Sequence, residues 1–255
     1  MRKPILFALA VAAAVPAPAA APKAPPADIA ASVAASDRPE DARKLDESRR
    51  PAEILAFMGL RRGDIALDLF TGTGYWAEIM ARAVGPRGGV LAWEPANFYD
   101  AKTKQGWAEL KARAPNAGLM VSPADSFSLP RSAFDFVMLN LNYHDTYWQS
   151  AKFNFPRVDP AAFLATLHAS VKPGGIVAVI DHVADPGGDT REVVEKLHRI
   201  DPAVAKADFE RAGFVLEAES NLLRNRADDH KKLVFDPAVR GKTDRIAYRF
   251  RKPAR

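Results

Sequence analysis

The stretch that most constrains the fold is "IALDLFTGTGYWAEIM", residues 65–80, in which an apolar run leads through a glycine-rich corner into a helical pattern. The run over residues 65–70 predicts a β-strand, and the pattern over residues 75–84 predicts a helix. Gly72 and Gly74 let the backbone approach a ligand closely, because neither residue carries a Cβ atom. The first amides of the helix would be free to bind an anion. The corner is therefore predicted to hold a ligand.

The same alternation of strand and helix continues along the chain. Further strands are predicted over residues 89–93, 118–122, 134–141, 176–181, 214–220 and 245–251. Residues 37–60 are predicted to be helical, with a second helix beginning at Pro51, and further helices are predicted over residues 101–114, 160–171 and 202–212. Asp159 and Asp201 each precede a proline that opens a helix, as expected of an N-cap residue. Such alternation predicts an α/β fold with a doubly wound, mostly parallel seven-stranded sheet and helices on both faces. The last strands have no helix between them, which predicts an antiparallel strand at the edge.

Residues 1–21 have the pattern of a signal peptide. Arg2 and Lys3 form a basic start, and the apolar run over residues 4–15 is too short to span a bilayer comfortably. Small residues in A-x-A spacing follow, up to Ala21. The pattern predicts export, to the periplasm, with an uncleaved anchor or a disordered Ala/Pro-rich start as the alternatives.

Residues 22–36 are rich in Ala, Pro and Ser and are predicted to be a linker, which leaves residues 37–255 as one domain. The chain has no cysteine, so neither a disulfide nor a lipid-anchored cysteine is possible. The net charge of +5 is spread along the chain, with a mildly basic end over residues 249–255. No basic stripe with interleaved aromatics is present, so nucleic acid is not a predicted partner.

No later apolar run is long enough for a membrane helix, and stable membrane insertion is not expected once the signal is cleaved. The expected partner is a small-molecule substrate. The sequence does not indicate an oligomeric state.

Several ligands could occupy the glycine corner. A phosphate-binding P-loop is disfavoured, because Tyr75 follows Gly74 where such a loop has lysine. The spacing does satisfy a dinucleotide fingerprint, with Glu94 about twenty residues further on, so NAD is not rejected by spacing alone. Asp68 in the strand and Asp125 after the third strand add carboxylates at the same predicted edge. Three acids favour a nucleoside with cationic substituents over one with two phosphates.

The segments "ALDLFTGTGYWAEIMA", "VLAWEP", "PADSFSLP", "FDFVMLNLNYHD" and "VKPGGIVAVIDH" resemble, in order and spacing, the motifs of class I S-adenosylmethionine-dependent methyltransferases. The resemblance covers about residue 37 to the end. The later part of the chain resembles a group of predicted bacterial methyltransferases that carry export signals. The resemblance implies a Rossmann-like methyltransferase fold and S-adenosylmethionine as the cofactor.

The resemblance also implies a set of cofactor-binding residues: Asp68, Thr71, Gly72, Thr73, Gly74 and Tyr75 at the methionine part, Glu94 at the ribose, Asp125 and Ser126 at the adenine edge, and Asn140 closing the pocket. Phe70 departs from the family pattern, which usually has glycine at this position. Its ring could crowd the cofactor.

The segment "NLNYHDTYW", residues 140–148, follows the fourth predicted strand, where an acceptor would lie beside the cofactor. Methyl transfer mainly requires alignment of the two partners and, where needed, removal of a proton from the acceptor. His144 is the best candidate base, because an unperturbed histidine titrates near neutrality. Tyr143 and Asp145 could orient His144 or line the pocket. Alternatively, His144 is an ordinary loop histidine.

The sequence does not favour a metal site, because no pair among His144, His182, His198 and His230 has i, i+4 ligand spacing. The loop that follows His182 could be a lid or an ordinary connection. The sequence therefore favours an S-adenosylmethionine-dependent methyltransferase that acts on an unknown, small-molecule acceptor. The alternatives are an exported non-catalytic binding protein on the same fold and an NAD-dependent oxidoreductase.

Overall fold

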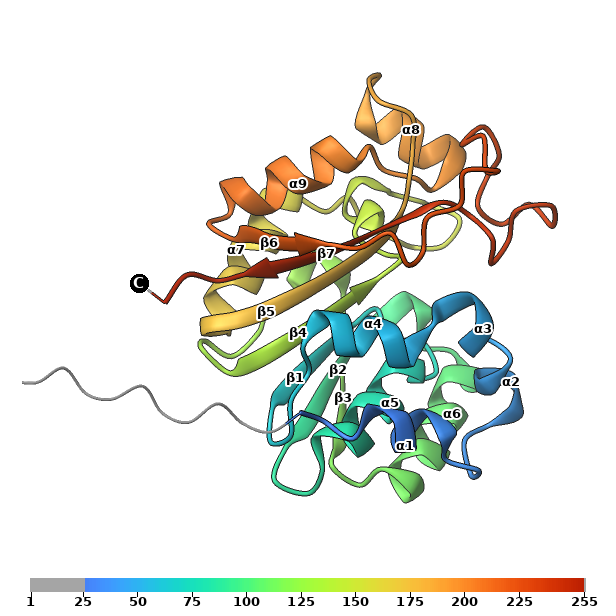
Figure 1. Cartoon of the computed structure of the whole chain (residues 1–255). Coiled ribbons are helices and arrows are strands. Elements are labelled where there is room, and N and C mark those ends of the chain that lie inside the picture. Colours follow the sequence, from blue (N-terminus) through green and yellow to red (C-terminus); the bar gives the residue numbers. More distant parts are fainter. Residues whose placement is uncertain (1–25, 255) are drawn as a thin grey trace, which may run out of the picture.

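The computed structural model describes residues 26–254 and contains the predicted seven-stranded sheet (Figure 1). The strands are β1 (Ile65–Leu69), β2 (Gly89–Pro95), β3 (Ala117–Ser122), β4 (Phe134–Asn140), β5 (Val171–His182), β6 (Val215–Glu219) and β7 (Arg245–Arg251). The predicted signal peptide lies outside the described residues, and export stays a prediction.

The helices are α1 (Ile29–Ala34), α2 (Glu40–Arg43), α3 (Asp46–Arg49), α4 (Pro51–Met58), α5 (Tyr75–Val84), α6 (Ala101–Arg113), α7 (Pro160–Ser170), α8 (Thr190–Leu197) and α9 (Pro202–Arg211), with 3-10 turns η1 (Ala96–Phe98), η2 (Ala124–Ser126) and η3 (His144–Tyr147). No helix within residues 26–254 is both long enough and apolar enough to cross a membrane.

The strand order is β3-β2-β1-β4-β5-β7-β6. The first five strands in this order are parallel, whereas β7 runs antiparallel to both β5 and β6. This confirms the predicted mostly parallel sheet with an antiparallel edge. Strands β2 and β3 follow β1 in order toward one edge of the sheet, and β4 then lies on the other side of β1. In an open α/β sheet, a ligand binds beyond the carboxyl ends of the strands at such a reversal.

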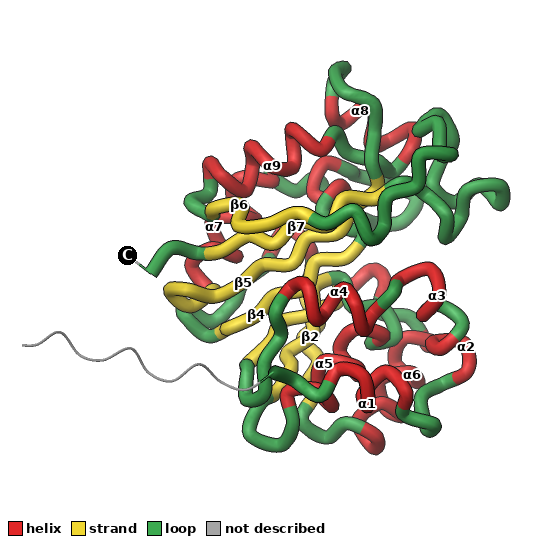
Figure 2. Tube along the Cα trace, in the orientation of Figure 1, coloured by secondary structure: helices red, strands yellow, loops and turns green. Residues whose placement is uncertain are grey.

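Helices cover both faces of the sheet, as Figures 1 and 2 show. The core on one face includes α1, α4, α5 and α6, and the core on the other face includes α7, α8 and α9. Phe136 and Met138 of β4 point into the first core, while Val137 and Leu139 point into the second. The central strand is therefore apolar on both sides, which explains its unbroken hydrophobic run.

Two helices lie where the sequence predicted none. Helix α1 falls within the segment expected to be a linker, yet Ile29 is buried in the core with α5, and the Asp28 amide donates to the Ala83 carbonyl at 3.3 Å. Helix α8 follows the expected loop after β5, and Val194 buries it against the second core. Its N-cap is Asp189, whose side chain accepts a hydrogen bond from the Glu192 amide at 3.0 Å. In both places, packing against a neighbouring element stabilises a helix too short to stand alone.

The connection between β6 and β7, residues 220–244, contains no helix or strand (Figure 2). Val234, Phe235 and Thr243 in this connection border the cavity at the carboxyl ends of β1, β4 and β5. The long connection therefore forms part of the candidate site.

Candidate functional site

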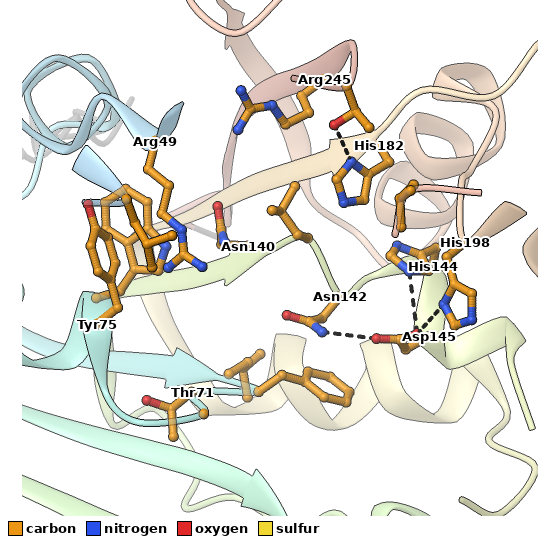
Figure 3. A pocket seen from close by; sticks show the side chains of 18 of the residues that line it. Arg49, Thr71, Tyr75, Asn140, Asn142, His144, Asp145, His182, His198 and Arg245 are labelled. Carbon is orange, nitrogen blue, oxygen red and sulfur yellow. Dashed lines mark hydrogen bonds and ion pairs between the residues drawn. The ribbon is translucent and has the colours of Figure 1, made fainter. Parts of the chain in front are cut away.

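A cavity of about 650 Å³ lies at the reversal of the strand order, where the carboxyl ends of β1, β4 and β5 meet. Figure 3 shows its two ends, with Asn140 and Asn142 between them. The corner end carries the glycine corner, with Asp68, Phe70, Thr71, Gly72, Thr73 and Tyr75, together with Arg49 of α3. The histidine end carries His144, Asp145, His182 and His198.

Asp68 organises the corner end. Its Oδ2 atom accepts hydrogen bonds from the Thr71 hydroxyl at 2.6 Å and from the Ala77 amide in the first turn of α5 at 3.0 Å. Because both bonds use Oδ2, Oδ1 is the oxygen available to a ligand. Burial raises the pKa of Asp68 to about 7, and the two hydrogen bonds and the Arg49 charge oppose this rise. The carboxylate therefore titrates close to neutrality.

Arg49 supplies a positive charge at the same end. Its guanidinium carbon lies 4.3 Å from the centre of the Tyr75 ring, and the Tyr75 hydroxyl donates to Asp46 at 2.7 Å. Burial lowers the pKa of Arg49. Arg245 of β7 also lines the cavity, and burial together with the charge of Arg49 lowers its pKa to about 10. Neither arginine was expected at the site, because each comes from an element outside the glycine corner and its motif.

The glycine corner is held by packing on its outer side. Gly74 has φ +87°, and a Cβ atom built there would lie 2.3 Å from Leu110 Cδ1. The Gly72 carbonyl accepts a hydrogen bond from Trp107 Nε1 at 2.9 Å. Gly74 is therefore needed for the close approach of α6, and it does not line the cavity.

Glu94 also lies outside the lining of the cavity. Its Oε2 atom accepts the Gly72 amide at 2.7 Å, and burial raises its pKa to about 7. Asp125 and Ser126 are exposed on η2 and do not line the cavity either. Of the three acids that the charge reasoning brought together, the structure places only Asp68 in the cavity. The ribose and adenine assignments stay predictions.

Phe70 occupies the position where the family pattern has glycine, and its φ of +53° is one that favours glycine. A non-glycine residue pays about 1–2 kcal/mol for this conformation. The ring lies edge-on to Trp93 with centroids 4.9 Å apart, and its centroid is 6.3 Å from that of Phe163. Phe70 therefore forms part of the cavity wall, and its packing in the second core offsets the backbone strain.

At the histidine end, Asp181 fixes the position of His144. The Asp181 carboxylate accepts the His144 amide at 2.8 Å and lies 2.7 Å from His144 Nδ1. Burial lowers the pKa of His144, but the charges of Asp181 and Asp145 outweigh it and raise the pKa to about 9. His144 thus holds a proton at neutral pH, so the reason for choosing it as a free base, an unperturbed pKa, does not hold.

Asp145 lies between two histidines. Its Oδ1 atom is 3.4 Å from His144 Nε2 and 3.4 Å from His198 Nδ1, and its Oδ2 atom accepts Asn142 Nδ2 at 2.9 Å (Figure 3). The neighbouring His182 pairs its Nδ1 atom with the Thr243 hydroxyl at 2.7 Å. Burial, together with the charge of His144, lowers the pKa of His182 well below its ordinary value. The His182 side chain is therefore uncharged at neutral pH.

Tyr143 does not belong to this group. Its side chain is fully buried outside the cavity lining, and its hydroxyl donates to Asp208 at 2.7 Å. Burial and the Asp208 charge raise its pKa far above the ordinary value. The structure thus separates Tyr143 from the predicted catalytic residues and gives it a role in packing against α9.

No family model matches the chain. Over 130 residues it is 29% identical to a demethylmenaquinone methyltransferase of Geobacillus kaustophilus (strain HTA426), a match covering 51% of this chain and 50% of that protein. A demethylmenaquinone methyltransferase of Staphylococcus aureus (strain JH9) is 28% identical over 128 residues, 50% of this chain and 47% of that protein. The chain thus spans about half the length of the curated relatives it matches.

Solved structures share most of the architecture. An S-adenosylmethionine-dependent methyltransferase from Aquifex aeolicus is 19% identical, with a TM-score of 0.56 over 83% of this chain and 97% of that one. One from Mesorhizobium loti is 18% identical, with a TM-score of 0.55 over 81% of this chain and 99% of that one. The cyclase SpnF is also similar, at 18% identity and a TM-score of 0.56 over 84% of this chain and 81% of that one. The chain therefore has the fold of the class I S-adenosylmethionine-dependent methyltransferases.

Proposed function

We propose that the protein is an S-adenosylmethionine-dependent methyltransferase that acts on a small, aromatic acceptor. The main support for the proposal is that a single cavity has two chemically different ends. The corner end suits the amino-acid part of the cofactor, and the histidine end borders the place for an acceptor. In-line transfer requires cofactor and acceptor to meet in one enclosed space. A volume of about 650 Å³ is within the usual range for ligand pockets.

The corner end is complementary to a free amino acid. Asp68 offers a carboxylate to an ammonium group, and Arg49 offers a guanidinium to a carboxylate. Each of these charges also influences the other, since Arg49 opposes the rise of the Asp68 pKa. The methionine part of S-adenosylmethionine carries both an ammonium and a carboxylate. The support for the cofactor is therefore this pairing of opposite charges, since only Asp68 of the three acids lines the cavity.

The same geometry disfavours a dinucleotide. The Gly72 amide, which a pyrophosphate would need, already donates to the Glu94 carboxylate. A pyrophosphate in that position would face Glu94 and Asp68 together, and like charges repel at this range. NAD is therefore the weaker candidate, even though the glycine spacing fits its fingerprint.

The acceptor proposal rests on the aromatic walls of the histidine end. Trp148 lines the cavity beside His198, with ring centroids 5.0 Å apart. Phe153 and Phe235 line it as well and are exposed large apolar side chains. Such a surface favours a planar, apolar molecule. The curated relatives are named for demethylmenaquinone, and we propose an acceptor with an aromatic or quinone-like ring of that kind.

The test compares binding of S-adenosylhomocysteine to the wild type, Asp68→Ala and Asp229→Ala by calorimetry. Asp229 is an exposed acid in the β6–β7 connection and serves as the matched control. We expect Asp68→Ala to lose at least about tenfold in affinity, because it removes the hydrogen bonds to Thr71 and Ala77 and the charge, whereas Asp229→Ala should bind like the wild type. Equal losses in both variants would refute the site assignment. Binding of the cofactor without methyl transfer to any quinone or phenol would support the alternative, a non-catalytic binding protein.

A further inference from the structure

We propose that His144, Asp145 and His198 bind a divalent transition-metal ion at the histidine end of the cavity. One ligand atom from each residue lies within 4.8 Å of the others. Two imidazole nitrogens and a carboxylate oxygen are a donor set that suits Zn²⁺ and the neighbouring first-row ions. This site goes beyond the proposed methyl transfer, and metal binding does not depend on it.

The spacing of the three ligand atoms fits a metal ion better than it fits hydrogen bonds. Asp145 Oδ1 lies 3.4 Å from both His144 Nε2 and His198 Nδ1. Charge-assisted hydrogen bonds between such groups are shorter, at about 2.7–2.9 Å. Ligand atoms around a tetrahedral ion with bonds of about 2.1 Å are roughly 3.4 Å apart. The two distances from Asp145 Oδ1 to the histidine nitrogens therefore already match the spacing of ligand atoms around a bound ion.

The groups behind the ligands hold them in the required orientation. His144 Nδ1 lies 2.7 Å from the fully buried Asp181, so Nε2 is the atom left for a metal, which would displace the proton from this nitrogen. A metal-binding histidine usually donates its other nitrogen to a carboxylate in this way. Asn142 donates to Asp145 Oδ2 at 2.9 Å, which leaves Oδ1 toward the two histidines.

The third ligand is held by the fold. His198 caps α8 with φ +50°, a conformation that non-glycine residues rarely adopt. Its ring packs against Trp148 and Phe235, with centroids 5.0 and 5.1 Å away. The backbone and two aromatic side chains thus place the imidazole next to Asp145.

The local charges also favour a cation. Asp145 and Asp181 bring two buried carboxylates to the cluster. Arg199, whose charge acts on His144, is already paired with Asp228 through contacts of 2.8 and 3.1 Å. In the metal-free protein these carboxylates are balanced by protonated His144, and a divalent ion would displace that proton and take over the positive charge.

The cluster opens onto the cavity, since all three ligand residues line it. Three protein ligands and an open position are the arrangement of catalytic metal sites, in which the fourth position takes water or substrate. The fourth ligand here would be an oxygen, nitrogen or sulfur atom of the acceptor. The metal would thus hold the acceptor beside the corner end, where the cofactor is proposed to bind.

The experiment is a calorimetric titration of the metal-free protein with Zn²⁺, in the absence of any cofactor. His198→Gln and Asp145→Asn each remove one ligand. His168→Gln is the matched control, because His168 lies on α7 against Phe214, outside the cavity. We expect the wild type and His168→Gln to bind one ion per chain, and the two ligand variants to bind at least about tenfold more weakly. Failure of the wild type to bind, or equal affinity in all four proteins, would overturn the proposal.

Cobalt-loaded wild type gives a readout that needs no variant. Co²⁺ held by three protein ligands in a low-coordinate site gives strong visible absorption bands, and these would support the proposal even if a ligand variant failed to fold. The weak spectrum of the hydrated ion would overturn it. Binding of S-adenosylhomocysteine to the same metal-free sample reports the proposed function separately, so the two proposals can fail independently.

Discussion

Replacing Asp68 by asparagine separates the charge of this residue from its role in shaping the corner. The amide oxygen of Asn can accept the hydrogen bonds that Oδ2 now accepts from Thr71 and Ala77. The substitution therefore keeps the corner in place and removes the negative charge. We expect the affinity of the wild type for S-adenosylhomocysteine to rise with pH, because the ammonium group of the ligand favours ionised Asp68. The affinity of Asp68→Asn should not follow this rise.

The size of the effect follows from the pKa of Asp68, which burial raises to about 7. With that pKa, only about one carboxyl in a hundred is ionised near pH 5. If the ligand binds the ionised form alone, affinity falls roughly 100-fold, or about 2.7 kcal/mol, from about pH 7.5 to about pH 5.

The raised pKa of Asp68 also makes the free energy of unfolding depend on pH. An acid whose pKa is raised in the folded state loses its proton first in the unfolded state. The free energy of unfolding of the wild type should therefore fall as pH rises from the ordinary value of 3.8 to about 7, and stay level above it. The penalty is at most about 4 kcal/mol, and Asp68→Asn should lack it.

The assay is calorimetry with S-adenosylhomocysteine at several pH values, with urea unfolding of the same two proteins. Parallel pH profiles of affinity in the wild type and Asp68→Asn would refute the reasoning. So would a flat profile in a wild type that binds the ligand well.

Two further predictions concern packing around the cavity. Gly74→Ala should lower the free energy of unfolding by about 2–5 kcal/mol, because the new Cβ meets Leu110 and the backbone conformation favours glycine; an unchanged urea midpoint would contradict this. Tyr143→Phe should cost about 1 kcal/mol through the lost hydrogen bond to Asp208. Its affinity for S-adenosylhomocysteine should equal that of the wild type, and a large loss there would place Tyr143 in the site after all.

The elements of the sheet could be predicted because their signals are local. The helix predicted over residues 75–84 and the strand predicted over residues 245–251 have the same bounds in the structure. Asp159 and Asp201 cap α7 and α9 as expected, since a cap depends only on the next few residues. Helix α8 had such a signal in Asp189, but the glycines before it favoured a loop.

The site was harder to predict because its contacts join distant parts of the chain. Arg49 and Arg245 have no motif around them, and only the fold brings them to the cavity. Glu94 has the spacing of a ribose-binding acid, yet its carboxylate bonds to Gly72.

The proposed metal ligands illustrate the same limit. The spacing rule for one helix rejected a metal, whereas His144 and His198 approach Asp145 from different elements, η3 and the end of α8. Spacing along the chain tests only ligands that share an element.

The most direct measurement of the central claim is a calorimetric titration of the wild type with S-adenosylhomocysteine and, separately, with NAD. The cavity should bind one S-adenosylhomocysteine per chain and should not bind NAD, because its corner end pairs Asp68 with Arg49 for an amino-acid group and offers no free Gly72 amide to a pyrophosphate. No heat and no rise in melting temperature with S-adenosylhomocysteine at saturating concentration, or binding of NAD instead, would contradict the account.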